Sequence, residues 1–331
     1  MMRSLVAFKD AVLDDDFMPG RNLSQEKLEH ALQNGDTVWI DVVDAPEEEI
    51  RWLEQQLGLH PLVVADLLRE DRRPALQVLT KYMFLSLFQP EIRLNKVRGM
   101  EIHCLIGANY FITIRPERAT AVDEAYNRVA QTVGPWKTGP SHFLYLTIQH
   151  VIDSYYPQLD RISNQLNRQE EVLLQNGINE SSRKPIYTIK QQLINLRQMV
   201  APQREVLSNA VGEERIAANP EIRDLFRHLY ERLLRIYDVV DTQRDLASNV
   251  LDMIDSREAN KLSETVGRLT ILSMIFLPLT FFTGLFQLNF ATTTDQLQLP
   301  ISGGAMFIGV MVLMIASVLF MGVYFRRHGW L

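Results

Sequence analysis

Two apolar stretches near the end of the chain decide the fold: LTILSMIFLPLTFFTGLFQL at residues 269–288 and AMFIGVMVLMIASVLFMGVYF at residues 305–325. Neither stretch contains Asp, Glu, Lys or Arg. Because a helix rises about 1.5 Å per residue and the hydrocarbon of a bilayer is about 30 Å thick, each stretch is long enough to cross it. The sequence therefore predicts two transmembrane helices, with a connecting loop at residues 289–304 and a short tail at residues 326–331.

The basic residues around these spans predict their orientation. They lie before the first span and after the second, at Lys261, Arg268, Arg326, Arg327 and His328. The connecting loop carries one charge, Asp295. Since cytoplasmic flanks are rich in Lys and Arg, we expect both termini in the cytoplasm, the loop outside, and a multi-pass protein of a bacterial-type inner (cytoplasmic) membrane.

Composition narrows the function further. The formal net charge of −6 argues against a nucleic-acid partner, which usually meets a basic face. A single cysteine, Cys104, excludes an intrachain disulfide and a Cys-rich zinc cage. The chain has no Walker loop, His-Glu-Xaa-Xaa-His or Gly-Xaa-Ser-Xaa-Gly motif, so we expect neither an enzyme nor a covalently bound cofactor.

Residues 1–140 have the pattern of a cytoplasmic α/β domain. Four runs are rich in β-branched and aromatic residues and predict strands: Thr37–Val43, Tyr82–Phe88, Met100–Ile106 and Tyr110–Arg115. Turn residues occupy Asn95–Gly99 and Gly107–Asn109. Between the strands, Pro46–Leu57 reads as a helix with a proline and three glutamates in its first turn.

Residues 141–268 have a helical pattern, which predicts a helical hairpin and a long stalk helix. Apolar residues recur every three or four positions from Ile148 to Leu166, which predicts one helix, and again from Ile186 to Val200. Pro202 is expected to disturb or end this second helix. A third periodic run follows Pro220 and continues into the first span, so we expect a stalk that is one helix of about 100 Å if unbroken.

One face of the first span and the helix before it mixes small, polar and apolar residues at helical spacing: Leu262, Val266, Leu269, Ser273, Leu277, Thr280, Gly284 and Gln287. Such a face either packs the two spans together or lines a pore. The alignment of several polar residues favours the pore, with Leu269 and Leu277 as apolar constrictions. Two spans cannot enclose an ion path, so a pore requires a symmetric ring of subunits.

The first span and several cytoplasmic motifs resemble the CorA family of divalent-metal transporters. The resemblance rests on Leu269–Thr270, Phe276–Phe281, Thr283–Phe286, Asn289, Val38–Val42, Pro46, Leu57–Pro61 and Arg73–Pro74. The Thr-Gly-Leu-Phe segment looks most like the zinc-transporting ZntB branch. The resemblance extends along the whole chain and implies an α+β membrane protein: a cytoplasmic α/β domain, a long stalk and a funnel-shaped homopentamer whose long helices line the pore.

The family also implies an outer pore mouth with a Gly-Xaa-Asn signature, from which this chain departs. Gln287, Leu288 and Asn289 stand at those three positions. The resemblance implies that Asn289 forms a ring of amide oxygens around a hydrated cation, near Gly284, while Gln287 narrows the entrance or adds a second amide ring. Asp295 is the one anionic residue available to attract cations in the outer loop.

The predicted function is transport or channelling of divalent cations, with zinc preferred. Magnesium or cobalt passage is one alternative, and a CorA-like membrane sensor or scaffold is another, because Gln287 alters the mouth. No metal-ligand set can be assigned. His103 and Cys104 are adjacent, and neighbours on a strand point to opposite faces, so we expect both to pack in the core. His60 and His228 are expected to be structural.

Overall fold

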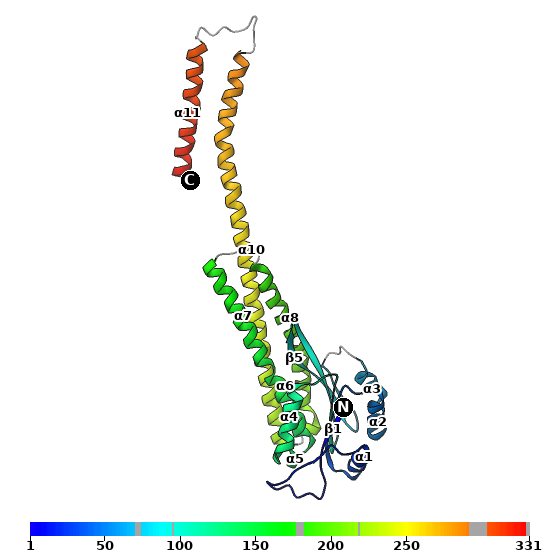
Figure 1. Ribbon diagram of the computed structural model, residues 1–331. Coiled ribbons are helices and arrows are strands. Elements are labelled where there is room, and N and C mark those ends of the chain that lie inside the picture. Colours follow the sequence, from blue (N-terminus) through cyan, green and yellow to red (C-terminus); the bar gives the residue numbers. More distant parts are fainter. Residues whose placement is uncertain (70–73, 95, 177–181, 218, 291–302, 329–331) are drawn as a thin grey trace. The chain divides into compact units, whose positions relative to one another are not determined.

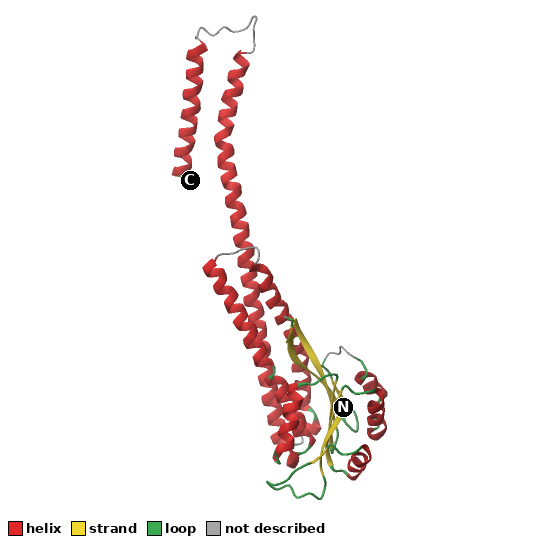
Figure 2. Ribbon diagram, viewed as in Figure 1, coloured by secondary structure: helices red, strands yellow, loops and turns green. Residues whose placement is uncertain are grey.

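The computed structural model describes residues 1–331 except 70–73, 95, 177–181, 218, 291–302 and 329–331. The chain divides into two compact units, Met1–Asp252 and Met253–Leu331. The first unit contains a seven-stranded sheet between two layers of helices, and residues 253–290 and 303–327 of the second are helical (Figures 1 and 2).

The sheet has the strand order β2-β1-β3-β7-β6-β5-β4. Its strands are β1 (Met2–Ala7), β2 (Gly20–Arg21), β3 (Thr37–Val43), β4 (Leu76–Val78), β5 (Met83–Arg93), β6 (Lys96–Ile106) and β7 (Tyr110–Arg115). Neighbouring strands pair antiparallel except β3 and β7, which are parallel with Val38 opposite Tyr110. The four predicted strands are all present, and the hairpin turn at Gly107–Asn109 is confirmed.

Two local predictions need correction. The expected turn at Asn95–Gly99 is wrong, because Lys96–Gly99 already pairs with β5 as part of β6. The segment Met2–Ala7 was not recognised as a strand, although it pairs along its whole length with β3. Its alternation is masked by Arg3 and Ser4, which find their partners only in distant parts of the chain.

Helices cover both faces of the sheet (Figure 1). One face packs against α1 (Gln25–Asn34), α2 (Glu47–Leu57) and α3 (Pro61–Leu67) through a core that includes Ile40, Leu53 and Val63. The helix predicted from Pro46 begins one residue later, at Glu47, and Pro46 is its N-cap instead of a residue of its first turn. The His60 imidazole accepts a hydrogen bond from Leu62 N at the start of α3. His60 is therefore a capping residue, which confirms its structural assignment.

The other face carries a buried charge network beside an aromatic cluster. Asp41 is fully buried and accepts hydrogen bonds from Arg3, Thr113 and Arg115. Arg115 also donates to Asp123 on α4 (Thr120–Gln131) at 2.7 Å. Trp39 donates to Thr113 and stacks on Phe143, 5.6 Å between ring centroids. Every oxygen of Asp41 thus has a partner, which a buried carboxylate requires.

The helical layer of the first unit contains α5 (Gly134–Thr138), α6 (Pro140–Asp153), α7 (Tyr155–Asn176), α8 (Arg183–Gly212), α9 (Glu214–Ala217) and the beginning of α10 (Pro220–Phe290). The single helix predicted from Ile148 to Leu166 is instead two, since α6 ends before Ser154 and α7 begins at Tyr155. Pro202 does not end α8, which continues through it to Gly212. The break between α6 and α7 keeps the apolar residues of both helices on one buried face. The spacing of apolar residues in the sequence therefore does not reveal it.

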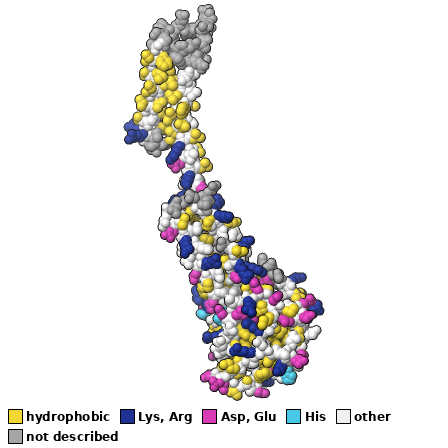
Figure 3. Space-filling model, in the orientation of Figure 1, with side chains coloured by type: hydrophobic (Ala, Val, Ile, Leu, Met, Phe, Trp, Pro, Cys, Tyr) yellow, Lys and Arg dark blue, Asp and Glu magenta, His cyan; other side chains and the backbone are white. Residues whose placement is uncertain are grey.

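Helix α10 is continuous from Pro220 to Phe290, as predicted, and Pro278 lies inside it. The second unit contains the later part of this helix and α11 (Gly303–Arg327). Two helices are long and apolar enough to cross a membrane, over Pro220–Leu285 and Phe307–Arg327 of the described chain. Hydrophobic side chains dominate the visible surface of the two apolar spans, whereas charged side chains are dispersed over the rest of the visible surface (Figure 3).

Candidate functional site

The predicted pore face of α10 is exposed in a single chain. Leu269 and Leu277 have exposed fractions of 62% and 74%, and Ser273, Thr280 and Gly284 are exposed as well. Val266 and Leu262, about one and two turns before Leu269, are also exposed. In one chain, this face is therefore available to other subunits or to water.

The less exposed residues of the same span lie mostly on the opposite side of the helix. They are Thr270, Ile271, Ile275, Pro278, Leu279 and Phe282, all of intermediate exposure. At about 100° per residue, most of them lie more than 120° from the line through Ser273 and Thr280. The polar face thus differs from the face that its own chain partly shields, which weighs against the interpretation that the hydroxyls pack the two spans together.

The hydroxyl groups of this face donate their hydrogens to the backbone of their own helix. Ser273 Oγ donates to Leu269 O at 3.0 Å, and Thr280 Oγ1 donates to Phe276 O at 2.9 Å. A hydroxyl has one hydrogen to donate and two lone pairs that accept. Since the hydrogen is used within the helix, each oxygen presents acceptor capacity alone to its surroundings.

The predicted mouth is described only in part. Gly284 is helical, and a Cβ added there would meet no heavy atom within 4 Å, so packing within one chain does not require glycine. The backbone of α10 includes residues 287 and 289, but the side chains of Gln287 and Asn289 lie outside the described residues, as does Asp295. Positions two residues apart in a helix differ by about 200°. Gln287 and Asn289 can therefore both face one axis only if the helix ends earlier in an assembled ring.

The Met1–Asp252 unit contains the histidine and the cysteine that the sequence raised as soft metal ligands. No three His, Cys, Asp or Glu side chains in the described part of the chain are placed to hold a metal ion. His103 is buried, as expected, with Nδ1 3.2 Å from Ser86 Oγ and Nε2 3.5 Å from Glu101 Oε2. Cys104 is also buried, and burial raises the pKa of its thiol, so it is neither a thiolate ligand nor a nucleophile.

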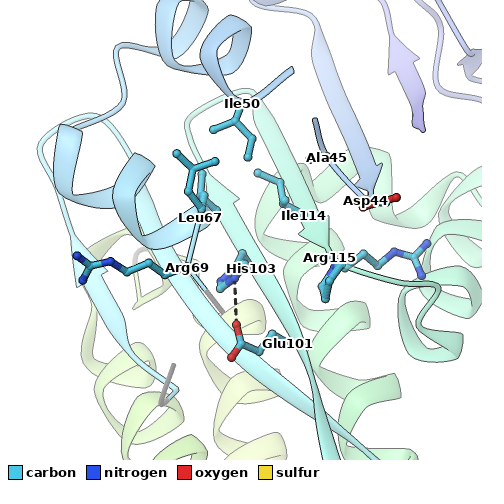
Figure 4. A pocket seen from close by; sticks show the side chains of 11 residues that line it. Asp44, Ala45, Ile50, Leu67, Arg69, Glu101, His103, Ile114 and Arg115 are labelled. Carbon is cyan, nitrogen blue, oxygen red and sulfur yellow. Dashed lines mark ion pairs between the residues drawn. The ribbon is translucent and has the colours of Figure 1, made fainter. Parts of the chain in front are cut away.

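His103 and Glu101 do more than pack, because they line a cavity of about 180 Å³ together with Leu67, Arg69 and Ile114 (Figure 4). The sequence contained the signal for this pair, since residues 101 and 103 of one strand share a face. Sequence reasoning considered His103 only with its neighbour Cys104 and missed Glu101.

Comparison with known proteins places these features in a family. The model for the CorA-like Mg2+ transporter protein family matches residues 34–327. The chain belongs to this family. CorA-like proteins transport divalent cations across membranes and are not enzymes, which agrees with the two apolar helices and with the predicted class of function.

The names of individual relatives mention different metals. A cobalt/magnesium transport protein CorA of Thermotoga maritima is 27% identical over 300 residues, covering 88% of this chain and 83% of that protein. A zinc transport protein ZntB of Yersinia pseudotuberculosis is 26% identical, covering 88% of both. The complete CorA magnesium transporter structure of Methanocaldococcus jannaschii matches with a TM-score of 0.78 at 20% identity, covering 100% of this chain and 99% of that one. This last match shows the fold, α+β with a long helix and two C-terminal apolar helices.

Proposed function

We propose that this CorA-like protein forms a homopentameric channel or transporter for divalent cations, with zinc preferred, in a bacterial-type inner membrane. The observation that carries the proposal is the exposed face of α10, on which Ser273 and Thr280 have used their hydroxyl hydrogens within the helix. In a ring, the line from Leu262 to Gly284 faces the axis. The positive-inside pattern places both termini in the cytoplasm.

Acceptor-only hydroxyls favour a hydrated cation. Water bound to a cation directs its hydrogens outward, so the hydroxyl oxygens can accept hydrogen bonds from the hydration shell. Strongly hydrated divalent ions lose their waters reluctantly and are more readily held through them. Water bound to an anion directs a hydrogen toward the anion and its oxygen outward. Such an oxygen would find no hydrogen-bond donor in the hydroxyls of Ser273 and Thr280. The face therefore suits passage of a divalent cation with its hydration shell.

The preference for zinc rests on the sequence. Thr283–Phe286 is similar to the ZntB branch, whereas other relatives are named for cobalt and magnesium. Neutral oxygen ligands of the described face do not discriminate strongly among these ions. Gln287, which replaces the glycine of the family signature, supports a second candidate function, a membrane sensor or scaffold that no longer conducts.

Uptake by the purified full-length protein in liposomes tests this proposal. With zinc, magnesium and cobalt offered separately at equal concentration, zinc uptake should exceed that of the other two ions, and empty liposomes give the background. Native mass measurement of the same preparation in detergent should show a pentamer. A monomer or dimer as the only species would remove the pore, and a pentamer that passes none of the three ions would favour the sensor or scaffold.

The mouth gives a second prediction. Asn289→Ala should reduce zinc uptake, because it removes the proposed amide ring that contacts the hydrated ion. Gln287→Gly restores the family pattern and should preserve or increase uptake. Both variants are compared at equal pentamer content. If Asn289→Ala transports zinc at the original rate, the mouth does not work as the family resemblance implies.

A further inference from the structure

The last turns of α11 carry an aromatic ladder on an exposed face. The rings of Phe320 and Tyr324 are stacked with centroids 6.5 Å apart, and those of Tyr324 and His328 are stacked 4.3 Å apart. Phe320 is 72% exposed and Tyr324 is 48% exposed. Leu313, seven residues before Phe320, is exposed on the same side. Leu313 and Phe320 thus form an apolar strip that ends in the phenol of Tyr324 and the imidazole of His328.

Phe325 shows that this ladder lies away from the packed side of the helix. It follows Tyr324 directly and is 1% exposed, so its side chain is covered while that of Tyr324 is not. The two rings are 6.0 Å apart at an interplanar angle of 71°. The ladder therefore occupies a side of α11 that its own chain leaves uncovered.

Two arginines follow the ladder on different sides of the helix. Arg326 and Arg327 are both exposed, and neither forms an ion pair with a described residue. Arg327 comes three residues after Tyr324 and seven after Phe320, which places it on the ladder face. Arg326 comes two residues after Tyr324, about 200° away. The charge of Arg327 is thus aligned with the apolar strip.

His328 adds a second polar group at the same end. Its Nδ1 lies 3.0 Å from Tyr324 O. Because a carbonyl oxygen only accepts, Nδ1 carries the hydrogen and Nε2 remains for another partner. The arginine, the imidazole and the phenol together form a polar end to a strip that is otherwise hydrocarbon.

We propose that this face, formed by Leu313, Phe320, Tyr324, Arg327 and His328, binds an anionic phospholipid of the cytoplasmic leaflet. The acyl chain lies along Leu313 and Phe320, and Arg327 binds the phosphate in a charge-assisted contact. A zwitterionic lipid brings its own cation close to Arg327, whereas a phosphatidylglycerol headgroup leaves the attraction uncompensated. The inference rests on the membrane placement of α11 in the proposed function, and it does not require a pore.

The test compares lipid retention on the full-length protein by native mass spectrometry, after extraction from membranes that contain equal phosphatidylglycerol and phosphatidylcholine. The wild type should retain phosphatidylglycerol preferentially. Arg327→Gln should weaken this retention about fivefold, the effect of one cation near an anionic surface. Arg327→Lys, which keeps the charge, should restore most of it.

Arg326→Gln is the matched control, since it removes the same charge one residue away and on another face. Its retention should stay close to that of the wild type. Equal losses in the two glutamine variants would show a diffuse surface charge instead of a site and would overturn the proposal. So would equal retention of the two lipids by the wild type. Because the readout is lipid retention and not ion uptake, a negative result would contradict the lipid site without contradicting the transport proposal.

Discussion

Replacing Arg115 with Met is expected to destabilise the Met1–Asp252 unit by about 3–5 kcal/mol, the usual result when one partner of a buried ion pair is removed. Arg115 is 1% exposed and its guanidinium is 2.8 Å from Asp41 Oδ2. Asp41 is fully buried, so no water can replace the lost partner. Arg3 would then be the one cation left to both Asp41 and Asp123, and Ala119 O would lose the guanidinium and keep Asp123 N as its donor.

The loss can be followed by thermal or urea unfolding of the full chain with tryptophan fluorescence. Trp39, one of four tryptophans, donates to Thr113, which itself donates to Asp41, so its contribution to the emission reports on the network. Arg93→Met is the control, because Arg93 is an exposed partner of Glu91 and Glu117 and such pairs contribute little. Similar transitions for the wild type and Arg115→Met would show that the network does not stabilise the fold.

The same network predicts a dependence on pH. Burial alone raises the pKa of Asp123, but the hydrogen bond and charge of Arg115, followed by those of Arg3, lower it below its ordinary value of 3.8. A lowered pKa in the folded state stabilises the fold above the ordinary value and loses this effect as the pH falls through the folded-state pKa. The difference between the wild type and Arg115→Met should therefore be largest near neutral pH and shrink below 3.8.

Local chemistry explains why much of the fold could be predicted. Thr37–Val43 and Tyr110–Arg115 are buried strands of β-branched and aromatic residues, and the period of α10 persists from Pro220 into the membrane span. Met2–Ala7 was missed because a strand with Arg3 and Ser4 looks irregular until Asp41 and the backbone N–H of Leu23 are known to be the partners of these two side chains. Pairing between distant segments is not encoded in a local pattern.

Part of the candidate site could likewise be predicted from the sequence, and part could not. Helical spacing alone placed Ser273, Leu277 and Thr280 on one face. The structure adds that their own chain shields mainly the opposite side and that the two hydroxyls donate to their own backbone, neither of which follows from spacing. The ring of subunits remains a proposal, because contacts between chains cannot be read from the period of one helix.

Leu277→Ser is expected to raise basal ion leak through liposomes by roughly tenfold, equivalent to about 1.4 kcal/mol in the barrier. Leu277 is 74% exposed in one chain and lies between Ser273 and Thr280 on the proposed pore face. A ring of leucines would form an apolar constriction that excludes water, and an ion cannot pass a dry segment without losing its hydration. A ring of serines would keep the constriction wet.

Leu272→Ser separates this effect from general damage to the span. Leu272 is 52% exposed and lies about 140° from Leu277 around the helix, so the same substitution there should leave the leak near its original level. Both variants must first be shown to assemble like the wild type by native mass measurement. An unchanged leak in an assembled Leu277→Ser protein would remove Leu277 from the constriction. Equal leaks in both variants would mean that a serine anywhere in the span perturbs the bilayer seal, and the orientation of α10 in the ring would have to be assigned anew.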